Sequence, residues 1–244
     1  MNLHTSAPAL TDGQVYAVTR ASARRRLCHQ PFMFQSPFRL LLVGQPGAGK
    51  TNATACIVNN GYVCHRPSFI YLVRRHHQDI YDRMLQHDNF EVLDNFEDFD
   101  LDTAPDGWLL IIDDMGFQMA ESRAFSDLLS SSGHRGLSII CLVPFLFDLG
   151  SKCASQRNLY SHIACFKSPF RQTETFMNKL YTEDDDVMDF LYEQCQRTPR
   201  SLLLFDMRQD RTQHQPLVQL HSFELFWTIP IGTGNFKIIL KKPV

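Results

Sequence analysis

The stretch that decides the fold is RLLLVGQPGAGKT, residues 39–51. An apolar run of strand length leads into a glycine-rich segment that fits the pattern G-x-x-x-x-G-K-[ST] at every fixed position. Glycines at this spacing let the backbone turn its N–H groups inward, toward the positive end of the helix that follows. The segment therefore predicts a strand, a phosphate-binding loop and a helix in succession.

This loop predicts a site for ATP and Mg²⁺. In such a loop the lysine reaches the β- and γ-phosphates, and the hydroxyl of the last residue binds magnesium. Lys50 is therefore a predicted catalytic residue, and Thr51 is a predicted metal ligand. The residues expected to contact the nucleotide are Gly44, Gln45, Pro46, Gly47, Ala48, Gly49, Lys50 and Thr51.

A second apolar run, residues 108–112, ends in the two acids Asp113 and Asp114. An acid at the carboxyl end of a parallel strand faces the crevice where ligands bind. We predict that Asp113 binds magnesium through water and that Asp114 polarises the attacking water. Adjacent acids at a strand end also start turns or cap helices, and this alternative stays open for both residues.

Apolar runs alternate with helix-compatible stretches along the chain. Strands that are apolar on both faces and separated by helices favour an α/β fold, with a mostly parallel sheet flanked by helices on both faces. We predict a mobile basic N-terminal arm (1–31), a P-loop ATPase domain (32–210) and a C-terminal extension (211–244), with the acidic stretch 89–106 as a surface connection. The predicted strands are 38–43, 68–73, 108–112, 138–143, 161–166 and 201–205, and the predicted helices are 49–60, 79–86, 120–130 and 184–194.

Composition restricts the function further. The formal net charge of -2 provides no molecule-wide basic field, so any contact with nucleic acid must be local or built by assembling subunits. The 7 cysteines are scattered without zinc-site spacing and are typical of reduced intracellular thiols. No apolar run reaches the roughly 20 residues needed to cross a bilayer, so we expect neither membrane insertion nor secretion.

Features beyond the two motifs carry a family resemblance. They include FQSPFRLLLVG (34–44), FIYLV (69–73) followed by Gln78 and Tyr81, IIDDM (111–115), HRGLSIICLV (134–143), SHIACFK (161–167) and RSLLLFD (200–206). Together these segments resemble the viral genome-packaging ATPases of the FtsK-HerA superfamily, particularly the poxvirus-type enzymes and those of adintoviruses and Polinton elements. The resemblance covers about residues 32–210 and implies the additional-strand, RecA-like type of P-loop NTPase.

The resemblance implies a homo-oligomeric ring that threads double-stranded DNA into a capsid, with ATP bound between neighbours. It implies that Arg157 completes the neighbouring site as a catalytic arginine, with Arg135 as the runner-up. A capsid protein is then a possible partner, and the expected location is intracellular, in the host nucleus or cytoplasm, or with virions. Candidate DNA contacts are the basic stretches 24–26, 74–77 and 237–242.

One departure from the family pattern keeps other functions open. Family members usually carry a polar residue, commonly Gln, at the end of the fourth strand to hold the hydrolytic water, but here that strand ends in Val143 and Pro144. Asn158 or His134 is a hypothetical substitute. The alternatives to a DNA translocase are a nucleotide-binding assembly factor with weak or lost hydrolysis, as in a domesticated copy, and a P-loop kinase, which the pair Asp113 and Asp114 disfavours.

Overall fold

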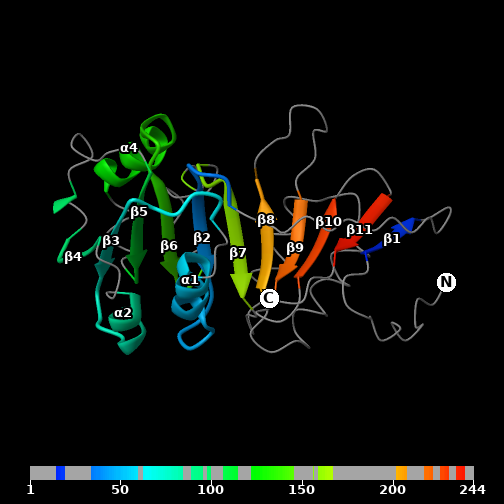
Figure 1. The fold of residues 1–244 in the computed structure, drawn as a ribbon, viewed down its shortest axis with the longest axis horizontal. Helices are drawn as coiled ribbons and strands as arrows, with labels where there is room; N and C mark the ends of the chain where they lie inside the picture. The colour runs from blue at the N-terminus through cyan, green and yellow to red at the C-terminus, as the bar shows by residue number, and fades with distance from the viewer. Residues whose placement is uncertain are drawn as a thin grey trace.

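A nine-stranded sheet organises the molecule, with the strand order β10-β9-β8-β7-β2-β6-β5-β3-β4 (Figure 1). The structure is a computed structural model, and it describes residues 15–19, 34–59, 63–84, 89–95, 98–99, 107–114, 122–145, 156, 159–166, 202–207, 217–221, 226–230 and 235–239. Among these residues, no helix is long and apolar enough to cross a membrane.

The strands from β7 to β4 are all parallel. The strands β2, β5, β6 and β7 are apolar runs that are buried on both faces, which is the pattern of a sheet covered on both sides, whereas the edge strand β4 is half-buried. This confirms the predicted α/β fold with a mostly parallel sheet. The bounds are β2 Arg39–Val43, β3 Phe69–Arg74, β4 Phe90–Leu93, β5 Trp108–Asp113, β6 Ser138–Val143 and β7 His162–Phe166.

Strand β6 lies between β2, which leads into the glycine-rich loop, and β5, which ends in the first acid. This inserted strand confirms the additional-strand type that the sequence predicted. Its register aligns Val43 with Val143 and Leu142 with Asp113. The loop after β2 and the acid at the end of β5 therefore lie on the same edge of the sheet, one strand apart.

Antiparallel strands extend the sheet beyond β7. They are β8 (Leu202–Asp206), β9 (Leu217–His221) and β10 (Phe226–Pro230), each paired with the strand before it. A separate antiparallel pair joins β1 (Val15–Thr19) to β11 (Asn235–Ile239). Both predicted terminal segments thus contain strands, and the division of the chain at residues 31 and 210 stays a prediction.

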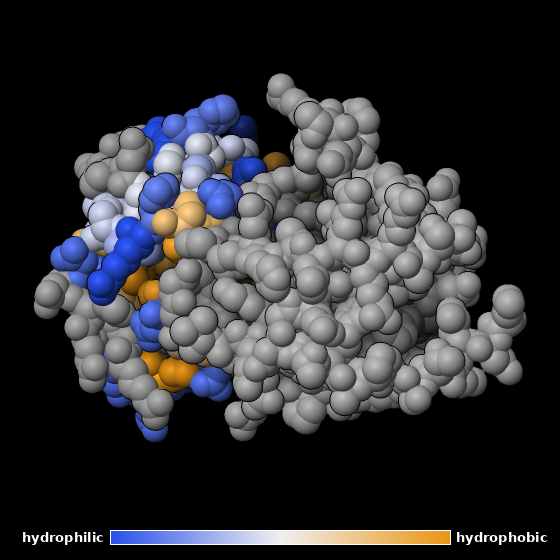
Figure 2. Space-filling view, turned by 45° about the vertical axis from the view of Figure 1, so that its right-hand side comes forward, coloured by the Kyte–Doolittle hydropathy of each residue, from blue (hydrophilic) through white to orange (hydrophobic). Residues whose placement is uncertain are grey.

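Helices cover both faces of the parallel strands. Helices α1 (Lys50–Asn59) and α2 (Asp79–Met84) pack on the face that carries Leu42, Leu72 and Ile111, and Tyr81 belongs to the same apolar cluster. Helix α4 (Arg123–Ser131) lies on the opposite face, where its Leu129 carbonyl accepts a 2.9 Å hydrogen bond from the Arg39 guanidinium. Figure 2 shows hydrophilic residues over much of the coloured surface, with smaller hydrophobic patches between them.

Some predicted boundaries were wrong. Residues 89–106 were expected to form only a surface connection, but residues 90–93 form β4, a short edge strand that is parallel to β3. Helix α4 begins at Arg123 rather than residue 120 because the Ser122 hydroxyl caps it, accepting from the Phe125 N–H at 3.2 Å. The 3₁₀ helix η2 (Ser132–Arg135) follows α4 directly. The predicted helix 184–194 lies outside the described residues.

Candidate nucleotide-binding site

The glycine-rich loop folds tightly between β2 and α1. Gly47 and Gly49 adopt positive φ values of 79° and 102°, which side-chain-bearing residues rarely adopt. At Gly44 a Cβ atom would lie 2.9 Å from the Phe166 Cβ, so β7 packs directly against the loop. The Gly44 N–H donates to the Val143 carbonyl at 3.1 Å, which ties the loop to the end of β6.

Lys50 is folded back onto its own loop. Its Nζ donates to the Gly44 carbonyl at 2.5 Å and to the Gln45 carbonyl at 3.1 Å. Burial lowers the pKa of Lys50, while the charges of Asp113 and Asp114 oppose that shift. Two of the three ammonium hydrogens are thus used within the loop, and a bound phosphate would take the third or replace one of the carbonyl partners.

Asp113 lies at the centre of a polar cluster at the end of β5. Its side chain is buried, and its Oδ2 accepts from the Tyr81 hydroxyl and, at 3.1 Å, from the Gln78 Nε2. The Thr51 hydroxyl lies within hydrogen-bonding reach of both Asp113 and Tyr81. The two predicted metal ligands, Thr51 and Asp113, thus lie together although 62 positions separate them in the chain.

Burial dominates the electrostatics of this cluster. It raises the pKa of Asp113, and the Tyr81 hydrogen bond and the Lys50 charge only partly oppose that effect. Burial also raises the pKa of Tyr81, and the neighbouring Asp113 charge adds to the shift. The phenol therefore keeps its proton and acts as a donor to the carboxylate.

Asp114 leaves the strand in a different conformation. Its φ of 58° lies in the left-handed region, which a non-glycine residue enters at a cost of about 1 kcal/mol or more. Its N–H donates to the Leu142 carbonyl at 3.3 Å, and its side chain is exposed. The regular strand ends at Asp113, so the alternation of side chains between the two faces of the sheet does not extend to Asp114.

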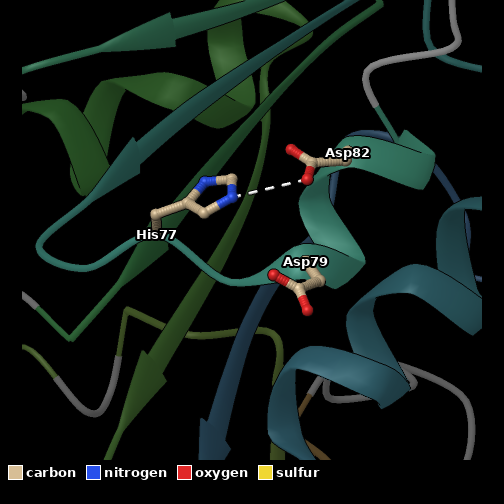
Figure 3. A group of neighbouring side chains, drawn as sticks. All are labelled: His77, Asp79 and Asp82. Carbon is tan, nitrogen blue, oxygen red and sulfur yellow. Dashed lines mark ion pairs between the residues drawn. The ribbon is translucent and has the colours of Figure 1, made fainter.

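The segment between β3 and α2 holds Tyr81 in place. The Arg74 guanidinium lies 5.7 Å from the centre of the Tyr81 ring and donates to the His77 Nδ1. The His77 Nε2 in turn lies 3.4 Å from the Asp82 carboxylate, an ion pair drawn in Figure 3. These contacts connect the end of β3 to the first turn of α2.

Among the described residues, His77, Asp79 and Asp82 are the only three or more His, Cys, Asp or Glu side chains whose ligand atoms lie close enough to share a metal ion (Figure 3). Arginine can only donate, so the His77 Nδ1 is the acceptor and a neutral ring carries its hydrogen on Nε2. That hydrogen faces Asp82, so neither ring nitrogen is available to a metal ion in this arrangement. All three side chains are exposed, and the group is better explained as a contact that fixes α2.

The remaining predicted residues do not gather at the site. Arg157 and the suggested substitute Asn158 lie outside the described residues. His134 and Arg135 lie in η2, before the amino end of β6, while the glycine-rich loop lies at its carboxyl end. The six residues of β6 span about 20 Å at about 3.3 Å per residue. His134 therefore cannot supply a polar group to the site of its own chain, which corrects that suggestion.

No role was predicted for Gln78 or Tyr81, although both formed part of the family resemblance. Their approach to Asp113 depends on how α2 packs against β3 and β5, which a local pattern does not report. A sequence signal for both residues was available, because they follow the buried strand β3 closely and so lie at the edge where the parallel strands end.

The arrangement fits a nucleotide with a magnesium ion. Gly47 has no atom within 4 Å of the position of an added Cβ, so the turn of the loop is open to a ligand. A helix amino end with converging N–H groups suits a phosphate. The oxygen donors of Thr51 and Asp113 suit Mg²⁺, which prefers oxygen ligands.

Comparisons with known proteins agree with this fold. The sequence matches no protein-family model and no curated protein. Among solved structures, the chain is similar to the genome packaging NTPase B204 from Sulfolobus turreted icosahedral virus 2 in complex with sulfate, with a TM-score of 0.54 and 15% identity over 78% of this chain and 98% of that one.

Two further similar structures are also described as packaging proteins of Sulfolobus viruses. They are the same NTPase in complex with ATP-gammaS (TM-score 0.49, 15% identity, 76% of this chain and 97% of that one) and B204, the DNA-packaging ATPase from Sulfolobus turreted icosahedral virus (TM-score 0.49, 14% identity, 77% and 98%). These structural neighbours are viral genome-packaging NTPases. At such low identity, the likeness to the first of them shows the P-loop NTPase fold.

Proposed function

We propose that this chain is an ATPase that couples hydrolysis to the translocation of double-stranded DNA and packages the genome of a virus or a virus-like element. One observation carries the proposal. The loop from Gly44 to Thr51 and the buried Asp113 lie at the same sheet edge, with β6 between their strands. This is the arrangement of an NTPase with an inserted strand rather than that of a small-molecule kinase.

The chemistry expected at this site is hydrolysis of the γ-phosphate. The loop amides and Lys50 bind the phosphates, and Thr51 and Asp113 hold Mg²⁺, which supplies charge neutralisation on the phosphate oxygens when it is bound. Asp114 accepts a proton from the attacking water. Its exposure and its approach to Lys50 are consistent with this role.

The structural neighbours support the packaging part of the proposal. The solved genome packaging NTPase in complex with sulfate shares this fold over 98% of its length. The sequence resemblance to poxvirus-type and Polinton-type enzymes adds the finer assignment within the FtsK-HerA superfamily. A homo-oligomeric ring, Arg157 as the arginine acting in the neighbouring site, a capsid partner, and an intracellular or virion-associated location all belong to this proposal.

ATP hydrolysis with and without double-stranded DNA tests the proposed function. Wild-type protein should hydrolyse ATP in the presence of Mg²⁺, and double-stranded DNA should stimulate it. Lys50→Ala should abolish both rates, because Lys50 is the cation of the loop and is proposed to bind the β- and γ-phosphates. Arg123→Ala is a matched control, since its side chain is 95% exposed and meets Asp127 only at 4.0 Å.

The outcomes separate the candidate functions. Turnover that DNA does not change, or that survives Lys50→Ala, would refute the translocase. Binding of ATP without hydrolysis would favour the assembly factor, which is a second candidate because Val143 and Pro144 provide no polar side chain at the end of β6. ADP formation that requires a small acceptor would favour the kinase.

A further inference from the structure

The end of β6 offers no polar side chain that could hold a water molecule. β6 lies between β2 and β5, so its carboxyl end adjoins both the phosphate loop and Asp113. Val143 and Pro144 occupy that end, and the Val143 carbonyl is used by the Gly44 N–H. A hydrolase with this site needs the water to be held from another element.

Few polar side chains of the described residues lie beside Asp113, on the strand next to β6. The Tyr81 hydroxyl donates its hydrogen to Asp113 and is buried. Thr51 is a proposed metal ligand, and Asp114 is the proposed proton acceptor. Gln78 differs from these because its side chain is exposed and yet contacts the cluster, through its Nε2 at 3.1 Å from the Asp113 Oδ2.

The amide of Gln78 has the chemistry that the role requires. Its bond to Asp113 uses one of two amide hydrogens, and the side-chain carbonyl oxygen is a separate acceptor. An amide can therefore accept from a water molecule while it remains attached to the acid. In some P-loop NTPases, a glutamine side chain orients the attacking water.

The position of Gln78 is fixed by the backbone around it. Its carbonyl accepts from the Tyr81 N–H at 2.9 Å in the first turn of α2, and Tyr81 reaches the same carboxylate oxygen. Next to it, His77 is held by Arg74 and Asp82 (Figure 3). The segment thus presents Gln78 to the site from the side of β3, opposite the glycine-rich loop.

We infer that Gln78 is a catalytic residue that holds the attacking water, in place of the polar residue that β6 does not provide. The inference rests on the proposed function. The water oxygen forms a bond to the γ-phosphorus, and the bond from that phosphorus to the β–γ bridging oxygen breaks with its electron pair leaving on ADP. The water gives one proton to Asp114, and inorganic phosphate is released.

Two phosphate mimics test this role without relying on turnover. ADP with beryllium fluoride imitates the bound substrate, whereas ADP with aluminium fluoride imitates the transition state and includes the attacking water. Both would be titrated with Mg²⁺ against full-length wild type and Gln78→Leu, and ATP hydrolysis would be measured in parallel. Gln35→Leu is the matched control, because this exposed glutamine precedes β2 at the opposite sheet edge.

Gln78→Leu should bind the beryllium fluoride complex within about threefold of wild type. It should bind the aluminium fluoride complex about a hundredfold more weakly, and its kcat should fall by a similar factor with little change in KM, the scale expected for one transition-state hydrogen bond. Gln35→Leu should behave as wild type. Normal beryllium fluoride binding shows that the variant is folded.

The results distinguish this inference from the proposed function. If wild type hydrolyses ATP and Gln78→Leu retains both its turnover and its aluminium fluoride affinity, the role of Gln78 is refuted and the ATPase stands. Equal weakening of both mimics would also refute it, because Gln78 would then act in binding alone. Wild type that binds ATP and does not hydrolyse it would refute both.

Discussion

Tyr81→Phe tests whether the phenol stabilises the buried carboxylate of Asp113. The substitution removes one oxygen atom and keeps the ring, which is fully buried beneath the Arg74 guanidinium. The lost interaction is a hydrogen bond from a neutral donor to a carboxylate that is only 4% exposed. Hydrogen bonds to charged groups contribute about 1.5–3 kcal/mol to stability.

The free energy of unfolding should therefore fall by about 2 kcal/mol at pH 7.5 without nucleotide or Mg²⁺. For a chain of this size, such a loss lowers the melting temperature by about 4–8 °C. Circular dichroism during thermal and urea unfolding measures both quantities. Tyr71→Phe is the matched control, because Tyr71 lies on β3 among Phe69, Phe99 and Trp108, away from Asp113.

We expect Tyr71→Phe to change stability by no more than about 0.5 kcal/mol. The reasoning is refuted if Tyr81→Phe is as stable as wild type. It is also refuted if Tyr71→Phe is equally destabilised, since the effect would then follow from losing any tyrosine hydroxyl in this part of the sheet.

Two further substitutions probe the same site. Gly44→Ala places a Cβ 2.9 Å from the Phe166 Cβ, so it should lower the free energy of unfolding by about 1–3 kcal/mol and weaken ATP binding. Gly133→Ala is the control, because an added Cβ there has no atom within 4 Å, and it should change neither quantity. Urea unfolding measures the stability and nucleotide titration measures the binding. Asp113→Asn should stabilise the nucleotide-free protein at pH 7.5, because burial raises the pKa of Asp113 and the folded state therefore resists its ionisation. This gain should shrink as the pH falls, because the raised pKa makes the folded carboxyl take up its proton before the unfolded one does, and a gain that is independent of pH would contradict the assignment.

The parts of the site that lie in a continuous stretch could be predicted from the sequence. The glycines at 47 and 49 permit the positive φ values that the loop needs, and the run that ends at Asp113 is too apolar for an exposed strand. Both features are set by local chemistry. The approach of Thr51 to Asp113 then followed from the rule that parallel strands end at the same sheet edge.

The other parts depend on tertiary packing. Nothing in the residues around Tyr81 indicates that its hydroxyl meets an acid 32 positions away, because that contact is set by α2 resting on the sheet. The edge strand β4 was not predicted from the sequence, for a related reason. Its Phe90 and Val92 are only half-buried and are interrupted by Glu91, so the segment carries a weak strand pattern until β3 provides a partner.

The junction after β3 has a mechanical consequence. The Arg75 N–H donates to the Asp113 carbonyl at 3.3 Å, so the exposed basic residues 75–77 are fastened by their own backbone to the residue proposed to hold the metal. A pull on this segment reaches the end of β5 through that hydrogen bond and through the ladder that pairs β3 with β5. Residues 75–77 are among the proposed DNA contacts, so a strand bound there would act directly on the backbone of the proposed metal ligand.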